Sequence, residues 1–247
     1  MEPITWYLTG MEKHSDGREP DLMNNANAFI DTLREKSCAF TGQSYLIAMN
    51  QLSNHDHSRF LTRTNHKVGR VDELGSEAAE EGVSKAVFRE AVAMMMTWHG
   101  APTIYYGDEA GVCGFTDPDS RRTYPWGHED QDLIRYHKEL IRVRKENPAC
   151  RRGSGIPVYA KDGHFAFGRF LDDNHVLTII NNTEEAERMT IPVWQIEISD
   201  GELFERQVLS MEEEFNLEKA HYLVCDGKIE IYMPPYSAAV MSHTGNN

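Results

Sequence analysis

Apolar residues recur with a helical period in two stretches of the first part of the chain. In the first stretch they stand four, four, three and four positions apart, at Val83, Val87, Ala91, Met94 and Trp98. This spacing predicts a helix over residues 80–99 with one apolar face. The second stretch runs from Leu133 to Arg144 and predicts a helix that Asn147-Pro148 ends, because proline disfavours helical geometry in the residue before it. A third helix is expected over residues 22–39.

Short apolar runs separate these helices. Residues 46–52 and 103–106 are rich in β-forming side chains and are both predicted as strands. The resulting order of helix, strand, helix, strand, helix is typical of βα units around a parallel sheet. Active groups in such folds gather at the carboxyl ends of the strands. The first candidates for chemistry are therefore His55-Asp56 and residues 107–109.

Beyond residue 153 the pattern changes to strand-length runs separated by turn residues. The runs are residues 164–170, 176–180, 189–193 and 228–233. Pairs such as Asp162-Gly163 and Asp226-Gly227 between them are turn signals. This part is predicted as a small antiparallel β-sandwich. The change divides the chain into an α/β part, residues 1–152, and a β-sandwich domain, residues 153–247.

The charge balance excludes one class of partner. The 247 residues include 25 Lys+Arg and 39 Asp+Glu, for a formal net charge of −14, so a nucleic-acid binder that works by bulk positive charge is excluded. Hydrophobic residues make up 40% of the chain, which is enough for a packed core. No apolar run reaches the ~20 residues of a membrane span, and the first residues lack the pattern of a signal peptide. We expect no membrane partner and a cytoplasmic location.

The four cysteines are predicted to be free thiols. They stand far apart, without a C-x-x-C pair or a disulfide-rich spacing, at Cys38, Cys113, Cys150 and Cys225. Neither a zinc knuckle nor a disulfide framework is indicated.

Residues 54–59, Asn-His-Asp-His-Ser-Arg, place a carboxylate, two imidazoles and a guanidinium at one strand end. Burial and mutual contact there can shift pKa values. A plainer interpretation is that these residues only cap a turn, since Asn, Asp and Ser are common turn formers. A third interpretation is a metal site that uses His55 and His57. That site needs further ligands, which the sequence does not indicate, so neither a metal nor a cofactor is expected.

Residues 110–126 are too long and too rich in Gly, Pro and aromatic residues for a plain connector. Asp117 and Arg121 can hydrogen-bond sugar hydroxyls, and Tyr124 or Trp126 can supply a stacking face. The alternative is a loop that is held by internal salt bridges and packed by its own aromatic residues.

Three motifs together resemble the α-amylase family of glycoside hydrolases. They are Gln-Leu-Ser-Asn-His-Asp-His-Ser-Arg at 51–59, Gly-Ala-Pro-Thr-Ile-Tyr-Tyr-Gly-Asp-Glu at 100–109, and Asp-Pro-Asp-Ser-Arg at 117–121. Their order and separations are most similar to those of the neopullulanase, cyclomaltodextrinase and maltogenic amylase branch, and the resemblance covers essentially the whole chain. It implies the last βα units of a (β/α)8 TIM barrel. Strand 7 of the barrel would end at residues 54–56, and residues 103–109 would form strand 8 and the turn that leaves it. The family's C-terminal antiparallel β-sandwich follows.

The resemblance also implies roles for individual residues. Asp56 matches the family's third carboxylate, which stabilises the oxocarbenium-like transition state of the sugar at the cleavage point. His55 matches the imidazole that helps hold the same sugar. Asp117 and Arg121 match the pair that binds a neighbouring glucose. The implied substrate is an α-glucan or maltooligosaccharide.

The sequence departs from the family pattern at the other two carboxylates. The retaining mechanism needs a nucleophile and a general acid roughly 5 Å apart, and the family carries them at the ends of strands 4 and 5. The nearest likeness to the nucleophile motif, Gly69-Arg70-Val71-Asp72, has the wrong glycine spacing and follows Asp56 instead of preceding it. The chain is therefore interpreted as the C-terminal portion of a hydrolase and is predicted to be inactive alone. Its incomplete barrel is expected to favour self-association.

Two functions of other classes stay open at this stage. One is a non-catalytic module that binds glucan or completes the barrel of another chain. The other is a metal-dependent barrel hydrolase that uses His55 and His57.

Overall fold

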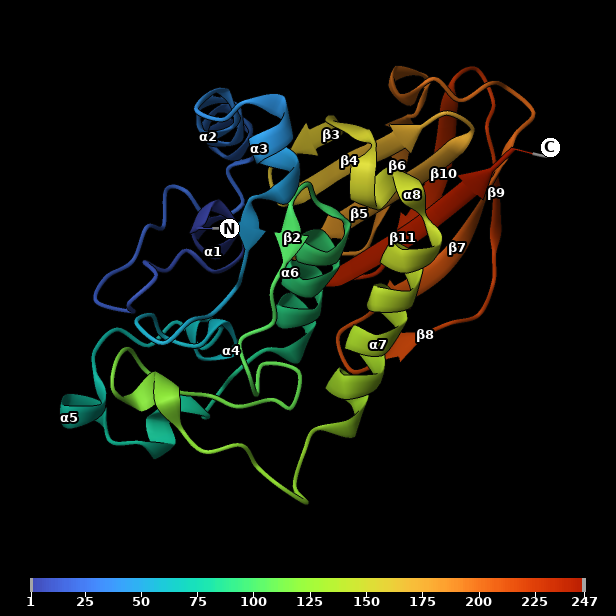
Figure 1. The fold of residues 1–247 in the computed structure, drawn as a ribbon. Helices are drawn as coiled ribbons and strands as arrows, with labels where there is room; N and C mark the ends of the chain where they lie inside the picture. The colour runs from blue at the N-terminus through green and yellow to red at the C-terminus, as the bar shows by residue number, and fades with distance from the viewer. Residues whose placement is uncertain (1, 246–247) are drawn as a thin grey trace.

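Helices are the main regular elements of the chain up to residue 152 in the computed structural model, which describes residues 2–245 (Figure 1). They are α1 (Glu2–Thr9), α2 (Ala26–Cys38), α3 (Gly42–Ile47), α4 (Phe60–Arg63), α5 (Val71–Leu74), α6 (Lys85–Thr97), α7 (Gln131–Glu146) and α8 (Pro148–Arg152), with 3-10 turns at η1 (Glu77–Ala79) and η2 (Asp119–Arg121). No helix within residues 2–245 is long and apolar enough to cross a membrane. The four cysteines are free thiols, as predicted.

Capping residues set where the helices begin. Asn25 accepts a hydrogen bond from the Ala28 N–H at the start of α2, so the expectation of a helix from residue 22 began too early. The expected start of α6 at residue 80 is also wrong. Gly82 has a φ of +73°, which is incompatible with a helix interior, and Ser84 caps α6 by accepting from the Val87 N–H. The prediction for α7 is confirmed.

Two very short strands form the expected parallel pair. β1 (Met49–Asn50) pairs in parallel with β2 (Ala101–Pro102). β1 is shorter than the strand predicted at 46–52, because residues 46–47 belong to α3. The strand predicted at 103–106 is wrong: β2 comes before it, and the pairing ends where the Thr103 N–H donates to the Asn50 carbonyl oxygen at 2.7 Å. A Cβ on Gly100 would lie 2.3 Å from the Ala48 carbonyl oxygen, so only glycine lets the two strands approach.

The chain beyond residue 153 forms two antiparallel sheets, whose strands are β3 (Ser154–Lys161), β4 (His164–Leu171), β5 (Asn174–Asn181), β6 (Glu187–Pro192), β7 (Leu203–Ser210), β8 (Phe215–Asn216), β9 (His221–Leu223), β10 (Lys228–Met233) and β11 (Ser237–Thr244). A 3-10 turn, η3 (Trp194–Ile196), follows β6. The large sheet has the order β3-β4-β5-β11-β7-β8, with β9 paired to β7, and β6 pairs with β10 in the small sheet. The four strands predicted from the sequence correspond to β4, β5, β6 and β10.

The large sheet is buried on both faces. Leu177 and Ile179 of β5 pack toward the small sheet, in one core with Ile191 of β6 and Ile231 of β10. Their neighbours in the strand face the other way and pack with the helices. Successive side chains of a strand point to opposite faces, and both faces of this sheet are buried. Apolar residues therefore follow one another in β5 without polar residues at every second position. The result is three layers: the small sheet, the large sheet and the helices.

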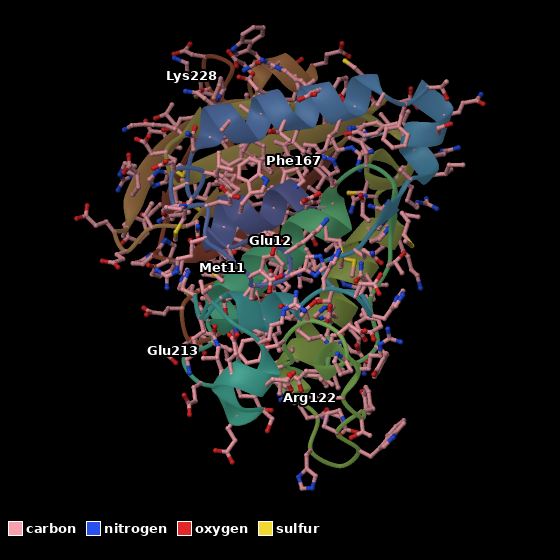
Figure 2. The ribbon with its side chains drawn as sticks, turned by 90° about the vertical axis from the view of Figure 1, so that its left-hand side faces the viewer. Met11, Glu12, Arg122, Phe167, Glu213 and Lys228 are labelled. Atoms are coloured by element: carbon pink, nitrogen blue, oxygen red, sulfur yellow. The ribbon has the colours of Figure 1, made fainter. Side chains whose placement is uncertain are left out.

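Aromatic residues fill the core between the large sheet and the helices. Phe165 of β4 lies edge-on to Tyr7 of α1 and Phe29 of α2, with ring centroids 6.2 and 5.1 Å apart. Phe167, labelled in Figure 2, belongs to the same core. Helix α6 is buried at every residue from Ala86 to Thr97, because the sheet, α1 and α7 all pack around it.

Candidate functional site

The turn after β1 presents His55 and Asp56 at the surface. The Asn54 side-chain oxygen accepts hydrogen bonds from the backbone N–H groups of Asp56 and His57, both at 2.9 Å. These two bonds within the turn fix its backbone conformation, so residues 54–57 need not belong to a strand or a helix. The side chains of His55 and Asp56 remain 60% and 59% exposed.

Hydroxyl side chains of a second segment, residues 114–121, hold it against the backbone of this turn. The Thr116 hydroxyl donates to the Asp56 carbonyl oxygen at 2.5 Å, and the Ser120 hydroxyl donates to the His55 carbonyl oxygen at 2.9 Å. These hydrogen bonds fix the position of the loop relative to the turn, although the two segments are about 60 positions apart in sequence.

The structure brings the four predicted site residues together. His55 Nε2 lies 3.2 Å from Asp56 Oδ1, and Arg121 Nη2 lies 4.0 Å from the same oxygen. Arg121 Nε forms a closer pair with Asp117 Oδ1, at 2.6 Å. Arg121 and Asp117 are 49% and 48% exposed, so water screens these pairs and they contribute little to stability. Their polar atoms remain accessible to a ligand.

Arg59 lies beneath the site and links its segments. Its side chain is fully buried and donates from Nε to the Ser120 carbonyl oxygen at 2.9 Å and from Nη1 to the Tyr106 carbonyl oxygen at 2.6 Å. Nη1 also lies 3.0 Å from Asp108 Oδ1. Burial raises the pKa of Asp108 above its ordinary value, and the Arg59 charge opposes that rise. The sequence placed Asp108 among the strand-end candidates at residues 107–109 and Arg59 in the motif at 54–59, but it did not indicate that the two side chains pair.

His57 does not share a ligand position with His55. Its ring packs edge-on against His14, with centroids 4.9 Å apart. Burial, followed by the charges of Arg63 and His14, lowers the pKa of His57 to about 4. Within residues 2–245 no group of three or more His, Cys, Asp or Glu residues is arranged to hold a metal ion. The interpretation of His55 and His57 as a metal site therefore has no support in this part of the chain.

The loop that follows the site combines both alternatives drawn from its sequence. Arg122 pairs with Asp119 and with Glu80, each at 2.9 Å, so ion pairs hold the loop in place. The rings of Tyr124 and Trp126 pack with centroids 4.5 Å apart. Trp126 nevertheless stays 80% exposed.

Curated relatives with similar sequences are named amylopullulanase, neopullulanase, cyclomaltodextrinase and maltogenic α-amylase. The family model described as "Alpha amylase, catalytic domain" matches residues 9–139. The chain is 32% identical to an amylopullulanase of Thermoanaerobacter thermohydrosulfuricus, over 81% of this chain and 13% of that protein. It is 36% identical to neopullulanase 2 of Thermoactinomyces vulgaris, over 58% of this chain and 22% of that protein. The chain thus spans less than a quarter of the length of either relative.

Solved structures show the same fold. An Anoxybacillus α-amylase matches with a TM-score of 0.73 and 22% identity, over 99% of this chain and 45% of that chain. A Nostoc punctiforme debranching enzyme soaked with acarbose matches with a TM-score of 0.68 and 21% identity, over 97% and 44%. The fold is a partial (β/α)8 barrel followed by an antiparallel β-sandwich. The family match and this fold together show that the chain belongs to the α-amylase family.

Proposed function

We propose that the chain is the C-terminal part of a retaining glycoside hydrolase of the α-amylase type. The whole enzyme would cleave α-glucosidic bonds in maltooligosaccharides, cyclodextrins or related α-glucans. The observation that carries the proposal is the half-exposed cluster in which Arg121 lies between Asp117 and Asp56, with His55 beside Asp56. The family match and the names of the relatives support the choice of substrate class.

In this proposal Asp56 stabilises the transition state at the cleaved bond. Glycoside cleavage builds positive charge on one sugar ring, and a fixed carboxylate gains interaction energy as that charge develops. His55, 3.2 Å from Asp56, would donate a hydrogen bond to a hydroxyl of the same sugar. Losing one such electrostatic contact costs about 3 kcal/mol, or about a hundredfold in kcat.

Asp117 and Arg121 would bind the neighbouring sugar. A carboxylate and a guanidinium 2.6 Å apart present acceptors and donors side by side, which suits adjacent hydroxyls. The charge on that sugar hardly changes during the reaction, so these hydrogen bonds would count equally before and during the chemical step. Their loss would raise KM and leave kcat nearly unchanged.

The chain alone is proposed to bind sugar without cleaving it. Asp56 can stabilise charge but cannot serve as both nucleophile and acid, and the sequence motif of the nucleophile is not matched. We expect no hydrolysis of starch, pullulan, cyclodextrin or aryl maltosides by the purified 247-residue chain. Turnover that disappears in Asp56→Asn would overturn the proposal of inactivity.

Binding tests the site itself. In an NMR titration with maltotriose, we expect the backbone signals of residues 54–57 and 117–121 to shift. Asp56→Asn should weaken these shifts, whereas Asp226→Asn, in an exposed turn of the sandwich, should leave them intact. Equal shifts in both variants would remove Asp56 from the site.

A second function, completion of a barrel, is favoured by one specific observation. Ile47 and Met49 beside the free edge of β1 are 76% and 62% exposed. A largely apolar hollow of about 320 Å³ lies next to them, lined in part by Phe40 and Trp98. Apolar edges of this kind favour association, so we propose that the isolated chain self-associates here or binds a chain that supplies the remaining barrel strands. A monomer in sedimentation at all concentrations would contradict self-association.

A further inference from the structure

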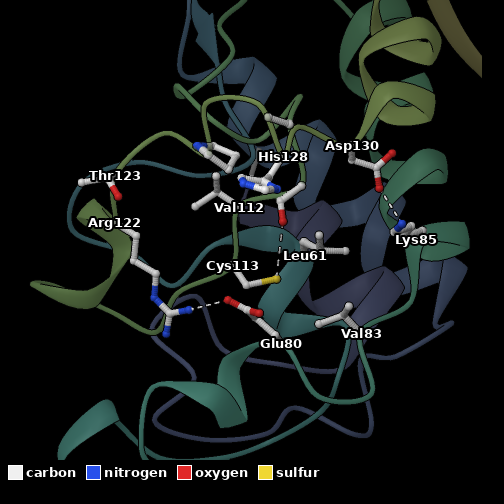
Figure 3. A pocket seen from close by; sticks show the side chains of 13 residues that line it. Leu61, Glu80, Val83, Lys85, Val112, Cys113, Arg122, Thr123, His128 and Asp130 are labelled. Atoms are coloured by element: carbon white, nitrogen blue, oxygen red, sulfur yellow. Dashed lines mark hydrogen bonds and ion pairs between the residues drawn. The ribbon is translucent and has the colours of Figure 1, made fainter.

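A hollow of about 510 Å³ lies beside the loop that carries Asp117 and Arg121, outside the site described above (Figure 3). Its walls come from residues 110–113, from several residues between 122 and 130, from the segment 80–85 that leads into α6, and from Leu61 of α4. Its volume falls in the range of cavities that hold small ligands.

Two ion pairs lie on opposite sides of this hollow (Figure 3). On one side Lys85 Nζ lies 2.5 Å from Asp130 Oδ2, and on the other Arg122 Nη1 lies 2.9 Å from Glu80 Oε1. Each charge already has a partner, so an anion or a cation would have to displace one. A neutral ligand with several hydroxyl groups can hydrogen-bond to both pairs without breaking either.

Part of the lining of the hollow is apolar. Leu61, Val83, Val112 and Pro125 contribute aliphatic surface to it. Burial raises the pKa of the Cys113 thiol to about 11, so this side chain stays uncharged. Sugar rings have the matching chemistry: apolar C–H faces and a polar edge of hydroxyls.

The hollow and the proposed glucan site use successive residues of one loop. Arg121 points to Asp117 and Asp56, whereas Arg122 points to Glu80 at the hollow. The Arg122 side chain is further held by Asp119, at 2.9 Å. A sugar bound in the hollow would therefore contact the same rigid loop that holds the site.

We propose that this hollow is a second carbohydrate site, which binds one or two glucosyl units of an α-glucan through the aliphatic part of its lining and two flanking ion pairs. The inference rests on the proposed function only for the identity of the sugar. The hollow lies next to a different set of residues, so binding there can be measured apart from binding at Asp56.

The test is the same maltotriose titration, read at residues 111–113 and 123–130. Thr123 is exposed on the rim of the hollow, and Thr123→Trp would occupy it. Thr190→Trp, on the exposed face of β6, is the matched control. We expect Thr123→Trp to weaken binding in the hollow at least ~10-fold and to leave the shifts at residues 54–57 intact, with no effect from Thr190→Trp.

A second variant covers the case in which Thr123→Trp does not fold. Lys85 is half-exposed, and Lys85→Met breaks one ion pair without opening the core, so it should also weaken binding in the hollow. Shifts at residues 54–57 without shifts at the hollow would overturn this inference and leave the proposed function standing. Shifts at the hollow without shifts at residues 54–57 would overturn the proposed function and leave this inference standing. No shifts at either place would overturn the inference and the proposed function. A stronger response of the hollow to inorganic phosphate than to maltotriose would also overturn the inference.

Discussion

The parallel pair β1–β2 and the seven-stranded antiparallel sheet differ in what holds them. The large sheet is buried on both faces, and its central strand β5 has no exposed residue. The parallel pair has two residues in each strand and an exposed apolar residue, Met49, in β1. The candidate site follows the weaker pair. Its geometry therefore depends on buried polar contacts, mainly those of Arg59, more than on a sheet.

The largest expected effect lies in the core between the large sheet and the helices. Phe165→Ala removes a fully buried ring that contacts α1 and α2 and should lower the free energy of unfolding by about 3–5 kcal/mol. Phe40→Ala, whose side chain is half-exposed near the parallel pair, should change it by less than about 1 kcal/mol. Urea denaturation measures both. Equal losses would mean that the two regions contribute alike.

Arg59→Met tests whether buried polar contacts hold the site. The substitution leaves the buried Asp108 carboxylate without its partner and should cost about 3 kcal/mol. It should also abolish maltotriose shifts at residues 54–57, because Arg59 joins Ser120 to Tyr106. Arg34→Met, on the exposed face of α2, is the control. Unchanged sugar binding in a destabilised Arg59→Met variant would show that the turn and the loop hold each other without Arg59.

Glu90 lies in α6, the helix between the parallel pair and the large sheet, and it should lower the free energy of unfolding as pH rises. It is fully buried, and neither carboxylate oxygen has a hydrogen-bond partner among residues 2–245. Burial raises the pKa of Glu90 well above the ordinary value of 4.5. The contribution of this shift to stability is therefore complete below pH 4.5, and it is lost as pH rises through the folded-state pKa. Glu90→Leu should gain about 1–3 kcal/mol at neutral pH and less in acid.

Denaturation of the Glu90 variant at several pH values, beside Glu35→Leu on the exposed side of α2, measures this gain. A gain that does not change with pH would contradict a protonated Glu90.

The smallest effect on stability is expected at the site surface. Arg121→Ala breaks two half-exposed ion pairs and should change the free energy of unfolding by no more than about 0.5 kcal/mol. Maltotriose binding at residues 117–121 should nevertheless weaken about tenfold. If Arg121 is only a loop salt bridge, melting temperature would fall and binding would stay unchanged. Melting curves and titrations on the same sample separate the two outcomes.

The sequence predicted β4, β5, β6 and β10, whose apolar or alternating runs are of strand length. β10 alternates exposed and buried residues along its whole length, and its bounds were predicted correctly. β3 contains Gly155 and Pro157, which weaken a strand signal, and β11 begins with small residues; both were missed. α6 was predicted with one apolar face, yet the large sheet, α1, α4 and α7 all pack against it. Such burial depends on contacts distant in sequence.

The site was predictable only as far as its motifs reach. His55 and Asp56 were candidates from their place at a strand end, and Asp117 and Arg121 from the long loop; the resemblance added their roles. The structure brings them together through ion pairs of 2.6–4.0 Å. Their roles stay predictions until binding is measured. The link from Arg59 to Asp108 joins residues 49 positions apart, and no periodic pattern in the sequence indicates such a pair.

The two-sided burial of the large sheet has a practical consequence for truncation. A polypeptide that begins at residue 153 would retain every strand of the sandwich and lose the helices that cover Phe165, Phe167 and Val240. It would also lose the carbonyl oxygens of Thr97 and Cys150, to which the buried Arg169 donates. Expressed without residues 1–152, the sandwich would expose one apolar face, and Arg169 Nη1 would lose both of its acceptors. We expect it to be recovered as aggregate unless the helices are supplied as a second polypeptide.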